Sequence, residues 1–161
     1  MRECVRYVLV GAGCAVLWAT PAQAQTRESH FGLHLLYNTS YSDAGVGVQF
    51  SAPIAYHLEF YPSFDAYFQS PGSIWEANVD VKYRASGDRG DWLYVGTGLN
   101  ISHVSAEDVS DTREGWNLFG GIESLRGQVH PFAEARVTVT GHTRFQMQGG
   151  INVTLGRHGR R

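Results

Sequence analysis

The residues best suited to chemistry lie close together in the segment SHVSAEDVSDTRE, at positions 102–114. His103 and Ser105 are two residues apart, and Glu107 and Glu114 follow in the same segment. A histidine that takes a proton from a serine hydroxyl, while a carboxylate orients the imidazole, is the arrangement of a hydrolytic triad. The alternative is an acidic surface loop between two strands, which needs no chemistry, and we favour that interpretation.

Other candidate ligands are scattered. Glu107, Asp108 and Asp111 supply carboxylates, but their spacing matches no dedicated calcium loop. His30 and His34 share one face of a predicted strand but lie too far apart along it to bind one metal ion. Basic residues cluster only in the last few positions. We therefore predict no cofactor, no metal site and no nucleic-acid partner.

The first 24 residues have the organisation of a secretory signal peptide. Arginines precede a short apolar run, and an Ala-x-Ala site ends at Ala24, so we predict a signal peptide over residues 1–24. Cys4 and Cys14, the two cysteines of the chain, both lie in this segment. Their removal leaves a mature chain without cysteine, which excludes a disulfide framework, a zinc-thiolate site and a cysteine nucleophile.

The charged residues are unusual in type rather than in number. The formal net charge is only −2, and Lys82 is the only lysine, so arginine supplies the other 12 of the 13 basic residues. Soluble domains commonly carry lysine on their surfaces. Arginine is preferred where a cation is buried and paired, because its planar guanidinium binds a carboxylate through two hydrogen bonds.

The elements that carry these residues alternate between apolar and polar side chains. A period of two is typical of a strand with one apolar and one polar face. Two residues depart from the pattern, since Phe119 falls in the polar register and Pro62 is expected to bulge its strand or end it early. Eight such segments are expected, at residues 31–38, 45–54, 56–68, 75–84, 92–102, 116–124, 132–140 and 145–155.

Three features indicate that the apolar faces point outward, toward lipid. Glycines crowd the polar register, where they would make room inside a narrow barrel. Aromatic residues mark the ends of the apolar stripes, as at the two interfaces of a membrane. The stripes are about nine to eleven residues long, the length of a strand that crosses a bilayer. We therefore predict an all-β fold, an eight-stranded antiparallel up-and-down transmembrane β-barrel over residues 25–156, followed by a short basic tail at residues 157–161.

The polar register also carries ten ionisable residues. In an eight-stranded barrel the interior is just wide enough for side chains. We expect these residues to interlock as a salt-bridged polar network that fills the barrel and leaves no pore. They are Glu59, Asp65, Glu76, Asp80, Lys82, Arg84, Glu123, Glu134, Arg136 and Arg144.

The C-terminal half resembles a known group of proteins. LYVGTGLNIS, LFGGIES, HPFAEARVTV and FQMQGGINVTLG are similar to the last four strands of small bacterial outer-membrane β-barrels of the opacity-type and related eight-stranded porin-like families. Within the last strand, QGGINVTL resembles the assembly signal of such barrels, through Gln148, Gly150, Val153 and Leu155. Leu155 stands where an aromatic residue is commoner, and the chain continues beyond it as GRHGRR.

The pattern and the resemblance together predict an integral outer-membrane protein with both termini in the periplasm. Its expected role is structural or interactive at the cell surface, without catalysis. The resemblance implies outer-membrane lipid, lipopolysaccharide and the barrel-assembly machinery as partners. Two alternatives stay open: a soluble secreted β-barrel that binds a small apolar ligand, and an outer-membrane hydrolase that modifies lipid A. The sequence departs from lipid A deacylases, in which asparagine commonly follows the serine, because Ala106 follows Ser105 here.

Overall fold

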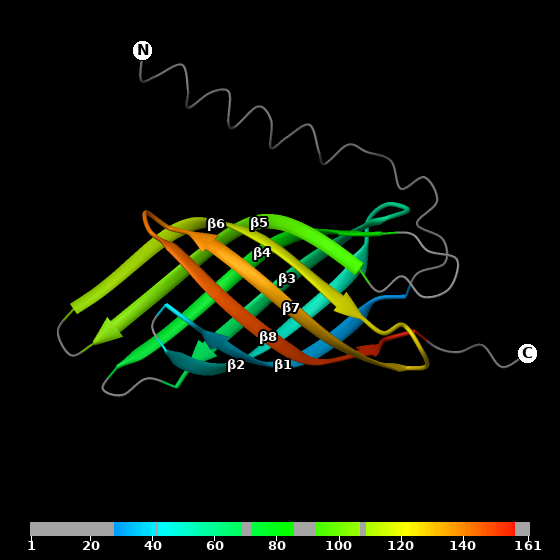
Figure 1. Ribbon diagram of the computed structural model, residues 1–161, viewed down its shortest axis with the longest axis horizontal. Coiled ribbons are helices and arrows are strands. Elements are labelled where there is room, and N and C mark those ends of the chain that lie inside the picture. Colours follow the sequence, from blue (N-terminus) through cyan, green and yellow to red (C-terminus); the bar gives the residue numbers. More distant parts are fainter. Residues whose placement is uncertain (1–27, 41, 69–71, 86–92, 107–108, 157–161) are drawn as a thin grey trace, which may run out of the picture.

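The computed structural model describes residues 28–40, 42–68, 72–85, 93–106 and 109–156, which form a closed antiparallel barrel (Figure 1). Each strand pairs with the next one in the sequence, and the last strand pairs with the first. The strands are β1 (His30–Asn38), β2 (Asp43–Pro53), β3 (Leu58–Tyr67), β4 (Ser73–Arg84), β5 (Leu93–Ala106), β6 (Val109–Glu123), β7 (Val129–Val139) and β8 (Thr143–Thr154). The predicted all-β, eight-stranded antiparallel barrel is confirmed.

The two ends of the chain lie partly outside this description. The predicted signal peptide, residues 1–24, and the predicted tail, residues 157–161, are not among the described residues. Within the described ranges, no helix is long and apolar enough to span a bilayer. The first strand begins and the last strand ends at the same end of the barrel, which we call the terminal end (Figure 1).

The closure of the barrel follows from matching alternation in its strands. In β1, buried and exposed residues alternate without exception from His30 to Asn38. Leu33, which faces outward, is flanked by Val48 of β2 and Ile151 of β8. Because a shift of one residue would turn every apolar side chain inward, this alternation specifies the register on both sides of β1.

Two expectations about β3 are wrong. Pro62 neither bulges nor ends the strand, because pairing with β2 keeps the same register on both sides of it, at Gln49 with Ser63 and at Ala52 with Phe60. A proline lacks only its own N–H, so the chain can pass through this position extended. The strand also begins at Leu58, later than expected, because the two residues before it belong to the turn after β2.

The expected acidic loop at residues 102–114 is mostly strand. β5 and β6 are 14 and 15 residues long, and they pair from Leu93 with Ile122 up to Ala106 with Val109. The last residue of β7 to pair with β6 is Val139, opposite Trp116. Within the described ranges, residues 109–115 of β6 therefore pair with β5 alone. The two strands therefore extend as a hairpin beyond the barrel at the end opposite the termini, which we call the loop end (Figure 1).

Candidate functional site

The ten ionisable residues predicted to face inward all lie inside the barrel, and each exposes 5% or less of its surface. Six carboxylates and four cationic side chains make up the set. Burial of an isolated charge is costly, so each group needs a partner within the barrel. Ion pairs connect nine of them in three clusters, one near the terminal end, one in the centre and one near the loop end. The tenth, Asp65, pairs with His34.

The terminal-end cluster contains two carboxylates and two cations. Arg84 donates from Nε to Oε1 of Glu59 at 2.9 Å, and its Nη2 lies 3.0 Å from Oε2 of Glu123. Nζ of Lys82 lies 3.1 Å from Glu59 and 3.5 Å from Glu123. The single lysine of the chain is thus shared between both carboxylates. The cluster is electrically balanced and ties strands β3, β4 and β6 together across the interior.

The central cluster forms around one arginine. Arg136 places Nη1 2.8 Å from Asp80 and Nη2 3.0 Å from Glu134, whose other oxygen accepts a hydrogen bond from the Tyr94 hydroxyl at 3.0 Å. The guanidinium carbon lies 4.6 Å from the centre of the Phe119 ring. This contact explains the apolar residue in the polar register, because an aromatic face attracts a desolvated cation.

The loop-end cluster includes polar residues that sequence reasoning missed. Arg144 pairs with Glu76 and also donates to Oδ1 of Asn100 at 3.2 Å. Asp65 lies 2.8 Å from Nε2 of His34. Inward-facing asparagines and His34 form hydrogen bonds to carboxylate oxygens that the four cations do not contact. Their position in the same register as the charges was the signal that could have identified them.

Glycines on the inner face make room for these side chains. A Cβ atom on Gly98 would overlap the Asp80 carboxylate and the backbone carbonyl of Val79. A Cβ atom on Gly47 would overlap both Asp65 and His34. The inward glycines therefore give the ion pairs the space they need, as their place in the polar register suggested.

The outer face of the barrel is apolar. Leu35 is 68% exposed and is one of 30 large apolar residues that are exposed in the described part of the chain. Tyr37 and Phe68 lie toward the loop end, whereas Phe31 and Tyr83 lie toward the terminal end. Among the described residues, no Asp, Glu, Lys or Arg faces outward between these two belts of aromatic rings. This arrangement is the reverse of a water-soluble protein and suits a lipid environment.

Among the described residues of the projecting hairpin, no hydrogen bond joins His103 to Ser105 or Glu114 of the candidate triad. The ring of His103 lies 2.9 Å from the Thr112 hydroxyl through Nδ1 and 3.4 Å from the Ser110 hydroxyl through Nε2. Ser105 pairs across the hairpin with Ser110, and Glu114 pairs with Ile101. Glu107 lies outside the described residues. Both ring nitrogens of His103 therefore contact hydroxyl groups of β6.

No cluster of three or more histidine, cysteine or acidic residues that could hold a metal ion occurs in the described part of the chain.

The residues of the suggested assembly signal occupy both faces of β8 and its end. Gln148 faces inward and donates to Glu134 at 2.8 Å, whereas Val153 and Leu155 are exposed. Gly150 packs against the backbone of β1, where a side chain would collide with the carbonyl of Leu33.

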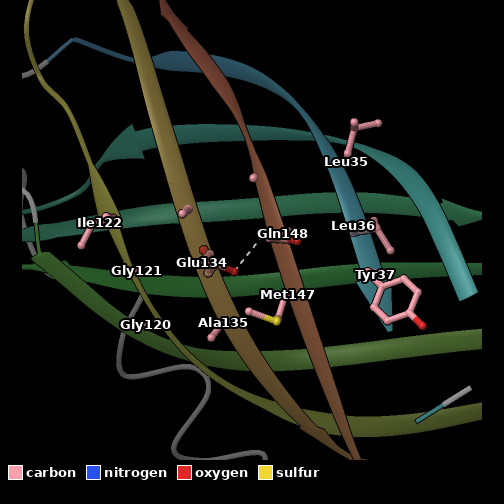
Figure 2. A pocket seen from close by; sticks show the side chains of 12 residues that line it. Leu35, Leu36, Tyr37, Gly120, Gly121, Ile122, Glu134, Ala135, Met147 and Gln148 are labelled. Atoms are coloured by element: carbon pink, nitrogen blue, oxygen red, sulfur yellow. Dashed lines mark hydrogen bonds between the residues drawn. The ribbon is translucent and has the colours of Figure 1, made fainter. Parts of the chain in front are cut away.

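A shallow groove of about 540 Å³ lies on the outer face, across β6, β7, β8 and β1 (Figure 2). Its floor is made of small residues, because Gly120 pairs with Ala135 and Ala133 pairs with Gly149. Leu35, Tyr37, Ile122 and Met147 line it with larger side chains. Beneath this floor lies the hydrogen bond between Gln148 and Glu134, drawn as a dashed line in Figure 2.

Comparison with known proteins identifies the fold but no sequence family. The chain matches no protein-family model and no curated protein by sequence. Its structure is similar to the N-terminal β-barrel domain of Pseudomonas aeruginosa OprF, with 13% identity, a TM-score of 0.65, and 78% of this chain and 96% of that one covered. It is also similar to Neisserial surface protein A, with 15% identity, a TM-score of 0.57, and 80% and 95% covered.

The outer membrane protein Ail of Yersinia pestis, solved in a phospholipid bilayer nanodisc, is similar as well. Its identity to this chain is 10%, the TM-score is 0.54, and 80% of this chain and 99% of that one are covered. These neighbours are small eight-stranded outer-membrane barrels, so the predicted resemblance is confirmed at the level of the fold.

Proposed function

We propose that this chain is an integral outer-membrane barrel with a structural or interactive role at the cell surface, without catalysis. The observation that carries this proposal is the inversion of polarity over all eight strands, with ion pairs inside and apolar side chains outside. In hydrocarbon, a closed barrel satisfies every backbone hydrogen bond, and the apolar face then needs no other cover. The fold shared with outer-membrane barrels supports this location.

A soluble barrel that binds a small apolar ligand is less well supported. Such a protein needs an apolar cavity inside the barrel and a polar surface outside. Here Arg84, Arg136 and Tyr61 are among the largest fully buried side chains, and they occupy the interior. An apolar ligand would have to displace paired charges, which is strongly unfavourable.

The interactive role is best assigned to the β5–β6 hairpin. With both termini in the periplasm, the hairpin projects from the cell surface. Along residues 109–115, β6 pairs with no strand other than β5 among the described residues, and Thr140 and His142 of the turn after β7 border it beside Asp111 and Arg113. We infer that the edge beyond this turn offers backbone N–H and C=O groups to a partner strand. Asp111 and Arg113, 2.7 Å apart, and Glu114 add exposed charges to this edge.

Hydrolysis of lipid A is the less favoured role. No carboxylate contact to His103 is found among the described residues, and its ring nitrogens lie against Thr112 and Ser110. A hydrolytic role would require Ser105 to reach the imidazole. Mass analysis of lipid A from cells that express the protein tests this directly, and loss of an acyl chain would contradict the non-catalytic assignment.

Outer-membrane lipid, lipopolysaccharide and the barrel-assembly machinery are the partners that follow from this proposal. The machinery would recognise the last strand by four of its residues, Gln148, Gly150, Val153 and Leu155. Val153 and Leu155 are exposed on the outer face, which suits contact with another protein during insertion. Replacement of Leu155 by phenylalanine, the commoner type of residue, should improve assembly, measured as the yield of folded barrel in the membrane.

Two measurements test the proposed location and the hairpin. The protein should partition with the membrane fraction and migrate differently on gels before and after boiling. Cells that display the full chain should then capture a surface partner, and a variant with residues 104–111 replaced by a tight turn should not. A variant altered in the turn 124–128, at the opposite end, serves as the control. Unchanged capture by the shortened hairpin, with the gel shift retained, would contradict the assignment to the hairpin.

A further inference from the structure

A second groove continues the one in Figure 2 toward the terminal end of the barrel. It has a volume of about 340 Å³, and both grooves are lined by Ile122 and Ala133. The register aligns the small outward residues across three strands, since Gly120 faces Ala135 on β7 and Ala133 faces Gly149 on β8. The result is a continuous recess in the outer face, with a smooth apolar floor that leads to the turn between β6 and β7.

A cation stands at the terminal end of this recess. Arg126 and Ser124, both in the turn after β6, line the groove beside Ile122. No ion pair of Arg126 is found among the described residues. Glu123 also borders the groove, but its carboxylate is turned inside and pairs with Arg84, so it leaves the charge of Arg126 uncompensated.

We propose that this recess binds one anionic phospholipid, with its phosphate at Arg126 and Ser124 and an acyl chain along Gly120, Ala133 and Ala135. The inference rests on the proposed function, because the groove must face the bilayer and the turn after β6 must lie at its periplasmic surface. The lipid then belongs to the periplasmic leaflet.

Charge and shape together distinguish this site from the rest of the lipid-facing surface. Another groove of about 500 Å³ lies on the outer face between β1, β2, β3 and β8, but no arginine or lysine of the described residues lines it. In the recess, a chain can lie close to the backbone because glycine and alanine remove the side chains in its way. A single unpaired arginine near the membrane surface favours an anionic over a zwitterionic headgroup by about fivefold.

The test uses the full mature chain, refolded into phosphatidylcholine vesicles with a minor fraction of phosphatidylglycerol and then released for native mass spectrometry. We expect one phosphatidylglycerol retained per barrel, in preference to phosphatidylcholine. Arg126→Gln should reduce that retention by about fivefold. Ala133→Leu should reduce it as well, by filling the groove without a change in charge. Arg113→Gln, which removes an arginine at the loop end, is the matched control and should retain the lipid.

Competition separates a lipid site from a headgroup site. Inorganic phosphate should not displace the phosphatidylglycerol, because the chain contributes to binding through the apolar floor. Equal retention of the two lipids by the unaltered protein, equal retention by Arg126→Gln, or a dimer through this face in place of bound lipid would each overturn the proposal. These results leave the gel shift on boiling intact, whereas loss of that shift and of membrane partitioning would overturn the proposed function itself.

Discussion

The guanidinium of Arg136 on β7 lies 2.8 Å from the carboxylate of Asp80 on β4, although β5 and β6 separate the two strands along the barrel wall. The pair crosses the interior. Both side chains are almost completely buried, so neither can be hydrated if its partner is removed. Cohesion of the barrel therefore comes from charge pairs that cross it, in addition to the hydrogen bonds within its wall.

Asp80→Leu should destabilise the barrel by about 3 kcal/mol, because it leaves Arg136 buried with only Glu134 as an anionic partner. Urea unfolding of the protein in vesicles, followed by tryptophan fluorescence, measures the change. Unfolding at the same urea concentration as the unaltered protein would mean that Asp80 faces solvent.

Val79, the neighbour of Asp80, should show the opposite preference, because its position should tolerate an apolar side chain but not a charged one. Its side chain is 54% exposed on the outer face. Val79→Arg should cost about 2–4 kcal/mol near the middle of the bilayer, because the charge would enter hydrocarbon. Val79→Leu should be almost silent, since lipid accommodates extra volume that a packed core does not. A damaging Val79→Leu beside a tolerated Asp80→Leu would reverse the assigned orientation of the barrel.

Glycines on the two faces of the wall should differ in their tolerance of alanine. Gly98→Ala should destabilise the protein by about 1–3 kcal/mol, because the added methyl group would meet Asp80 and the wall backbone. Gly149→Ala faces outward, where the nearest atom to the new Cβ is the Phe132 carbonyl oxygen at 3.5 Å, an ordinary contact. Its unfolding curve should nearly match that of the unaltered protein. Equal effects of the two substitutions would argue against a crowded interior.

The barrel should not conduct ions steadily. Lys82 and Arg84 on β4 pair with Glu123 on β6, and Arg136 on β7 pairs with Asp80 on β4, so these ion pairs cross the interior. An ion would have to separate these pairs to pass. Planar-bilayer recordings of purified protein should show no stable channel above the background of detergent alone. Large, long-lived conductance steps would mean that the interior opens under voltage.

Secretion should remove residues 1–24. The Ala-x-Ala site ending at Ala24 predicts a mature protein that begins at Gln25. The intact mass of protein extracted from membranes should equal that of residues 25–161, and Ala24→Leu should block cleavage and leave the longer chain. A full-length mass for the unaltered protein would contradict the predicted signal peptide.

Alternation along the chain was sufficient to predict the number of strands and the faces of residues such as Val79 and Asp80, because strand geometry alone places neighbours on opposite sides. It did not predict how far the strands extend. Residues 102–114 were expected to form a loop, because charged and hydroxyl side chains interrupt the alternation there. Instead, β5 and β6 continue through this segment, with cross-strand pairing up to Ala106 and Val109. The expectation that Pro62 would bulge or end its strand was wrong because β3 pairs with a strand on each side, which keeps it extended through this position.

The sequence by itself determined which side chains enter the interior, because a period of two leaves only two faces and one of them carries the charges. Which charges meet was decided by the tertiary structure. Arg136 finds Asp80 and Glu134, Lys82 is shared by two carboxylates, and Phe119 turns inward against a guanidinium. These contacts depend on the closure of the barrel and on the stagger between its strands, which bring residues far apart in the chain to the same height inside it.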